Sequence, residues 1–146
     1  MSYADERQAI ETRFATAWTA GSNTTVKYEN QKWEEPKGNN DYVALFIENL
    51  RADQIELRET ALHRHTGMIY VNIYTKKFTG TGSARILGDE IAVIFRRATF
   101  DSGSPKTGTI ICYSPHYEIV GEEQGRFVSR VSVPFYRDTS FTRPSS

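Results

Sequence analysis

Three histidines and one cysteine are the side chains of this chain best suited to catalysis or metal binding. His63 and His65 lie two residues apart, so on a β-strand both imidazoles would project from the same face, as a metal pair requires. A metal site needs a third ligand, which Glu59 or His116 would supply only if folding brought it close. Since no Cys or acidic residue stands at a metal-like spacing from the pair, the sequence predicts no metal and no cofactor.

Cys112 and His116 have the residue types of a catalytic nucleophile and its base. On one extended strand, four residues at about 3.3 Å each would separate them by roughly 13 Å. A catalytic hydrogen bond needs roughly 2.6–3.2 Å, so the pair fails unless Pro115 interrupts the strand. We therefore interpret Cys112 as a small, half-buried side chain, and the sequence predicts that the protein is not an enzyme.

The elements that must position these residues follow from the spacing of apolar side chains. Helical spacing predicts helices over 3–20 and 83–98, with apolar stripes formed by Ile10, Phe14, Ala17 and Trp18 and by Leu87, Ile91, Ile94, Phe95 and Ala98. Alternation predicts strands at 26–30, 42–49, 55–60, 66–77, 110–120 and 126–136, with Pro134 at an edge or bulge. This order predicts an α+β fold, a mainly antiparallel sheet of about five to six strands with both helices packed on one face.

Length and composition bound the remaining possibilities. The chain has 146 residues and one cysteine, so we expect a single domain over 1–138, a flexible tail over 139–146 and no intrachain disulfide. Lys plus Arg and Asp plus Glu both total 18, whereas a dedicated nucleic-acid binder is expected to be basic. No apolar run approaches the ~18 residues of a membrane span. The acidic N-terminus does not resemble a signal peptide, so the sequence predicts a protein made and kept in a cytoplasm.

One face of the strand predicted at 66–77 is unusually aromatic. Met68, Tyr70 and Tyr74 alternate with the apolar positions 69, 71 and 73, so helices packed on the other face would leave them uncovered. Aromatic residues and Met are enriched at protein interfaces, although a sheet covered on both sides is the alternative. We therefore expect contacts with neighbouring subunits or another protein at Trp33, Glu34, Glu35, Tyr70, Tyr74, Lys76 and Lys77.

Short motifs along nearly the whole chain resemble those of one family. They are the opening MSYADERQAIETRF, VKYEN at 26–30, RHTG at 64–67, AVIFRR at 92–97 and the ending VSVPFYRD at 131–138. In these motifs the chain is similar to the tail terminator (tail completion) proteins of lambda-type, long-tailed phages. That family has a sheet flanked by two helices and no catalytic residues.

The resemblance implies a structural protein of the virion, assembled in the host cytoplasm. Such proteins form a hexameric ring with copies of themselves at the head-proximal end of the tail tube. The ring contacts the tube protein, stops tube polymerisation and gives head-completion proteins a docking surface. DNA passes through its lumen in transit, without specific nucleic-acid binding or membrane contact.

The segment 32–41 departs from the family pattern, so contacts assigned there rest on the residue types alone. Two alternatives stay open: another neck or head–tail joining protein of similar fold, and a small-molecule enzyme or binding domain that uses His63, His65 and His116. The charge distribution suits a ring of unlike surfaces, because residues 1–73 carry 8 basic and 11 acidic side chains and residues 74–146 carry 10 and 7. The two halves therefore differ in sign, at −3 and +3.

Overall fold

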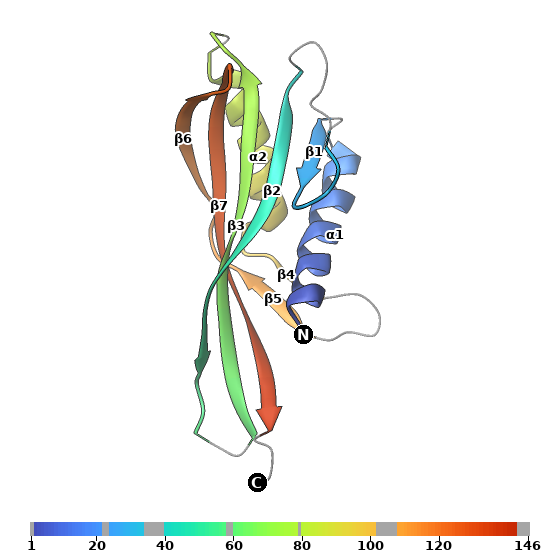
Figure 1. Cartoon of the computed structure of the whole chain (residues 1–146), viewed down its shortest axis with the longest axis vertical. Coiled ribbons are helices and arrows are strands. Elements are labelled where there is room, and N and C mark those ends of the chain that lie inside the picture. The colour runs from blue at the N-terminus through green and yellow to red at the C-terminus, as the bar shows by residue number, and fades with distance from the viewer. Residues whose placement is uncertain are drawn as a thin grey trace.

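The computed structural model describes residues 2–21, 24–33, 40–57, 60–78, 80–101 and 108–142 (Figure 1). These residues form two helices and seven strands: α1 (Tyr3–Gly21), β1 (Thr25–Tyr28), β2 (Tyr42–Gln54), β3 (Thr60–Lys76), α2 (Gly82–Phe95), β4 (Thr99–Asp101), β5 (Thr109–Cys112), β6 (His116–Glu123) and β7 (Arg126–Thr142). The predicted α+β class is confirmed, with seven strands in place of the five to six expected. β7 continues to Thr142, past the predicted domain end at 138.

The sheet is built around the long antiparallel pair β3 and β7. The order is β1-β2-β3-β7-β5-β4, and β6 also pairs with β7. β1 pairs with β2 in parallel, whereas the other described pairings are antiparallel. β7 pairs with β6 from Arg126 to Ser132 and with β5 at Phe135 and Tyr136. One edge of β7 is therefore shared by two shorter strands.

Pro134 lies at the point where this edge passes from β6 to β5. The backbone N–H of Tyr113 donates to the carbonyl of Pro134 at 2.9 Å, so this carbonyl faces the segment 113–115 that joins the two strands. The nitrogen of a strand residue points to the same side as its carbonyl. The missing N–H of Pro134 therefore falls where ladder pairing is interrupted, in agreement with the predicted edge or bulge position.

The apolar stripes of both helices and one face of the sheet form a single buried cluster. Its members include Ile10, Phe14 and Trp18 of α1, Leu87, Ile91 and Phe95 of α2, and Ile69, Val71, Ile73, Val131, Val133 and Phe135 of β3 and β7. The Phe14 ring stacks on Trp18 at 5.1 Å and on Phe95 at 6.0 Å between centroids. Ala17, predicted for the stripe, is exposed, whereas Ala9, outside the predicted stripe, is buried.

β2, β3 and β7 continue past the helices as a three-stranded extension, which we call the arm (Figure 1). It comprises residues 48–57, 60–66 and 136–142. β2 is buried over its first four residues and fully exposed from Glu48 to its end, which marks where the strand leaves the core. Gly67 lies at this junction, where a Cβ would stand 2.7 Å from the carbonyl oxygen of Glu48 and 2.6 Å from the Phe135 ring.

The arm accounts for the largest errors of the sequence prediction. The strand expected at 55–60 is wrong: residues 55–57 lie outside the strands, and the N–H of Ile55 donates to the carbonyl of Leu62 at 2.8 Å as the chain turns back. β2 and β3 both extend beyond the ranges 42–49 and 66–77. Their added residues mix polar and apolar side chains, so they lack the regular alternation that marks a half-buried strand. α2 ends at Phe95 rather than at 98, although Ala98 is still buried.

Candidate functional site

The aromatic residues singled out from the sequence gather on one side of the sheet. Tyr42 of β2 stacks on Tyr74 of β3 with ring centroids 4.5 Å apart, and Trp33 lies 5.1 Å from Tyr42. Phe46 and Tyr70 form a second pair at 5.3 Å, four residues further along the same two strands. Tyr70 and Tyr74 are half-buried and lie outside the core cluster, on the face opposite Ile69, Val71 and Ile73.

Two arginines of β7 lie over these rings. The guanidinium carbon of Arg126 is 4.8 Å from the centroid of Tyr42, and that of Arg130 is 5.0 Å from Tyr70. Arg130 also donates from Nε to the Asn72 side-chain oxygen at 2.8 Å, which fixes its plane. Such cation–π contacts contribute about 0.5–1 kcal/mol at exposed sites and about 2 kcal/mol when desolvated, and Arg126 is buried. We call the set the aromatic–arginine surface: Trp33, Tyr42, Phe46, Tyr70, Tyr74, Arg126 and Arg130.

The four charged residues predicted for this site have different outcomes. Glu34 and Glu35 lie outside the described residues. Lys76 is exposed at the end of β3, where it is paired in register with Arg126. Lys77 forms an ion pair with Glu122 at 2.7 Å, so its charge is partly compensated within the chain.

Sequence reasoning missed Tyr42, Arg126 and Arg130. Tyr42 is the register partner of Tyr74, and Phe46 is the partner of Tyr70. Arg126 and Arg130 occupy the strand positions that alternate with Phe127, Ser129 and Val131 of β7, the positions that face the core. The alternation was visible in the sequence, whereas the strand pairing that places these residues beside the aromatic rings was not.

The histidines and the cysteine are not assembled into a catalytic group. His65 is in register with Arg137 and His116 with Ser132, five positions apart along β7, or roughly 16 Å. Cys112 and His116 are in register with Phe135 and Ser132, which point to opposite faces of β7. Burial raises the pKa of Cys112 to about 12, so its thiol stays protonated and is a poor nucleophile near neutral pH. Among the described residues, no group of three or more His, Cys, Asp and Glu is placed to hold a metal ion.

The structure shows a buried ionic cluster that the sequence analysis did not predict. Glu6, placed by its sequence position in the first turn of α1, accepts a hydrogen bond from Arg137 Nε at 2.8 Å. Its second oxygen accepts from the Asn49 side chain at 2.8 Å. The Arg137 guanidinium also lies over the Tyr3 ring at 5.0 Å. The start of α1 is thereby attached to β2 and β7 at the base of the arm.

His65 borders this cluster and makes the arm base sensitive to pH. Its Nε2 lies 3.1 Å from the Thr139 hydroxyl, and its ring meets Tyr3 edge-on at 5.7 Å. Burial, followed by the nearby Arg137 charge, lowers the pKa of His65 below its usual value, with Glu6 opposing and His63 adding to the shift. Protonation therefore favours the unfolded chain.

We expect the protein to lose stability as the pH falls from about 7.5 through the unfolded-state histidine pKa of about 6.5. As the pH falls, His65 is protonated in the unfolded chain at a higher pH than in the folded protein. Stability is therefore lost until the pH has fallen below the lower, folded-state pKa of His65. Urea unfolding midpoints at several pH values, compared between the wild type and His65→Gln, measure this contribution. The exposed His116→Gln is the control, and equal pH profiles for the wild type and His65→Gln would contradict the assignment.

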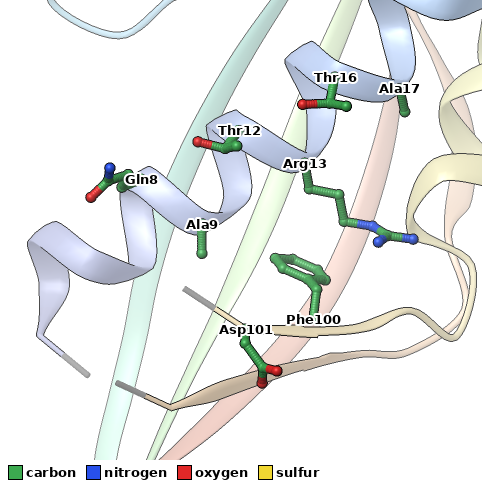
Figure 2. Close-up of a pocket in the computed structure, with 8 residues that line it drawn as sticks. All are labelled: Gln8, Ala9, Thr12, Arg13, Thr16, Ala17, Phe100 and Asp101. Carbon is green, nitrogen blue, oxygen red and sulfur yellow. The ribbon is translucent and has the colours of Figure 1, made fainter. Parts of the chain in front are cut away.

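A cavity of about 430 Å³ opens between α1 and β4 (Figure 2). Its lining is Gln8, Ala9, Thr12, Arg13, Thr16, Ala17, Phe100 and Asp101. Arg13 lies over the Phe100 ring at 5.0 Å and donates to the Ile94 carbonyl at 2.9 Å, while Asp101 accepts from Thr109 at 2.6 Å. The charged groups of the cavity are thus used in contacts within the chain, and its lining as described contains neither a cysteine nor a histidine.

Fold and site together describe a small α+β protein whose most distinctive feature is the aromatic–arginine surface. The family described as phage tail terminator protein matches residues 7–135, and the chain belongs to this family. It is a family of structural tail-assembly proteins rather than of enzymes, which places the protein in the virion tail.

Comparison with solved structures supports the fold assignment. One matched structure has a TM-score of 0.69 at 17% sequence identity, over 99% of this chain and 99% of that chain. At this identity the match establishes the shared fold alone. No curated protein matches the sequence. None of the described helices has the length and apolar character needed to span a membrane.

Proposed function

We propose that this protein forms a closed ring of identical subunits, six by family resemblance, that caps the tail tube, stops its polymerisation and offers a surface to which head-completion proteins dock. The observation that carries the proposal is the family match over residues 7–135. A ring is a head-to-tail assembly in which every subunit presents two unlike surfaces. We propose host-cytoplasmic assembly, with DNA passing through the lumen without specific binding.

The aromatic–arginine surface is our candidate for a contact with a neighbouring subunit or with the tail tube. Tyr, Trp and Arg are the residue types that most often dominate binding energy at protein interfaces. Here Trp33 and Tyr74 both pack on the Tyr42 ring. Arg130 lies over the Tyr70 ring and is held there by its hydrogen bond to Asn72. Because these side chains already hold one another in place, less conformational freedom is lost when a partner covers them.

We expect Tyr70→Ala/Tyr74→Ala and Trp33→Ala to lose tube capping while each monomer stays folded. Truncation of such a residue at an interface often costs about 2 kcal/mol or more of binding. This corresponds to a loss of roughly 30-fold at every junction of the ring. The measurements are thermal melting of each variant and the capping of purified tail tubes, scored by whether further tube growth stops.

Phe78→Ala is the matched control, because Phe78 is an aromatic side chain that is 95% exposed and lies outside the aromatic–arginine surface. Normal capping by both test variants would reject the surface as a contact site. Lost capping together with a collapsed melting temperature would assign Tyr70 and Tyr74 a role in folding instead. A wild type that attaches to heads but does not stop tube growth would point to another neck or head–tail joining protein.

A further inference from the structure

The outer part of β2 and the turn that follows it carry exposed apolar side chains among carboxylates. Leu50, Ile55 and Leu57 are large apolar residues exposed to solvent, and Leu57 is 97% exposed. The same segment, residues 48–57, contains three carboxylates and one arginine, a net charge of −2. It lies on the arm, away from both helices (Figure 1). Exposed apolar side chains concentrated in one short segment are typical of a surface that another molecule covers.

The outward side of α2 also carries exposed apolar side chains, and the helix region has a net positive charge. Ile86 and Val93 are exposed and lie two helical turns apart, on the same side of the helix. Residues 82–97 carry three arginines against two carboxylates, a net charge of +1. Beside this helix runs a groove of about 260 Å³ between α2 and β6, with Arg85 and Arg96 among its lining residues.

The groove also contains a polar group that lacks a partner. The hydroxyl of Tyr117, a groove-lining residue, is buried and has no hydrogen-bond partner among the described residues. The Tyr117 ring packs closely on Gly88, where an added Cβ would stand 2.8 Å from a ring carbon. The guanidinium carbon of Arg85 lies 5.2 Å from the centroid of the same ring. A buried hydroxyl without a partner costs free energy, which an incoming carboxylate or carbonyl would recover.

We propose that segment 48–57 of one copy packs on the outer side of α2 and its groove in the next copy. The inference rests on the proposed ring and names the two unlike surfaces that such a ring joins. The two surfaces have opposite net charge, and each presents exposed aliphatic side chains. They lie on separate parts of one chain, so a second copy supplies the partner for each. The acidic segment would then face Arg85 and Arg96, which line the groove.

A charge exchange tests this pairing. We expect Glu56→Arg and Arg96→Glu each to weaken self-association about ten-fold or more, because each places like charges together. The double variant Glu56→Arg/Arg96→Glu restores opposite charges at every junction and should regain most of the wild-type association. Sedimentation velocity measures assembly in solution, and tail-tube capping is scored in parallel. Melting temperatures check that each variant is folded, and Glu123→Arg, at an exposed position outside both surfaces, is the control.

Wild-type assembly by both single variants would overturn the proposed pairing and leave the ring itself intact. Failure of the double variant as well would also overturn it, because the two charges would then face different partners. Single variants that form rings but do not cap would assign the segment to the tube or head protein instead. A wild type that neither self-associates nor caps tubes would reject the ring function together with the pairing.

Discussion

Glu6→Ala should lower the free energy of unfolding by about 3–5 kcal/mol, because it leaves the buried Arg137 charge uncompensated. The Arg137 side chain is 1% exposed and that of Glu6 is 3% exposed, so water cannot replace the lost carboxylate. The same substitution removes the acceptor of the Asn49 amide, a second, partly buried hydrogen bond. Urea denaturation at neutral pH measures the loss.

Two further variants separate charge from packing. Glu6→Gln keeps an acceptor for Arg137 and should cost less than Glu6→Ala. In Glu6→Leu/Arg137→Met both charges are gone, so the double variant should be less destabilised than the sum of its single variants. Additive effects, or a loss below about 1 kcal/mol for Glu6→Ala, would show that the ion pair does not hold α1 to the arm base.

This cluster explains how a long arm is held on a small body. Glu6 belongs to α1, Asn49 to β2 and Arg137 to β7, so one carboxylate joins the helix to two strands at the point where they leave the core. The close fit at Gly67 lies beside it on β3. Disruption of this cluster should therefore loosen the arm before it loosens the sheet beneath the helices.

Much of the fold could be predicted from the sequence because the core is periodic. The spacing of Phe14, Trp18, Ile91 and Phe95 located both helices, and the alternation around Val71 located the central strand. The arm could not be predicted in the same way. Its strands show no regular apolar alternation, and β2 is exposed from Glu48 to its end, so the extent of these strands could be recognised only from their pairing with one another.

The candidate site, like the fold, was predicted from the sequence only in part. The sequence indicated an aromatic strand face at Tyr70 and Tyr74, and the structure adds Tyr42 and Arg130 as their direct neighbours. Those neighbours depend on strand register, which a single sequence does not determine. Glu6 was interpretable only as a helix-dipole residue, because its partner Arg137 lies 131 positions away.

Phe14→Ala and Phe95→Ala should each destabilise the protein by about 3–5 kcal/mol. Both rings are fully buried and stack on each other, so truncation of either removes apolar contacts and leaves a cavity between α1 and α2. The neighbouring Trp18 is fixed by a hydrogen bond to the Thr24 carbonyl at 2.8 Å, which limits collapse into that cavity. Urea unfolding of the two variants measures the effect.

Phe78→Ala provides the matched comparison, since it removes the same side chain from a position that is 95% exposed and should change stability by about 0.5 kcal/mol or less. The double variant Phe14→Ala/Phe95→Ala should cost less than the sum of its parts, because the second truncation enlarges a cavity that already exists. Equal losses at positions 14 and 78 would mean that α1 does not pack on α2 through these rings. The shared core would then have to be reassigned to the sheet alone.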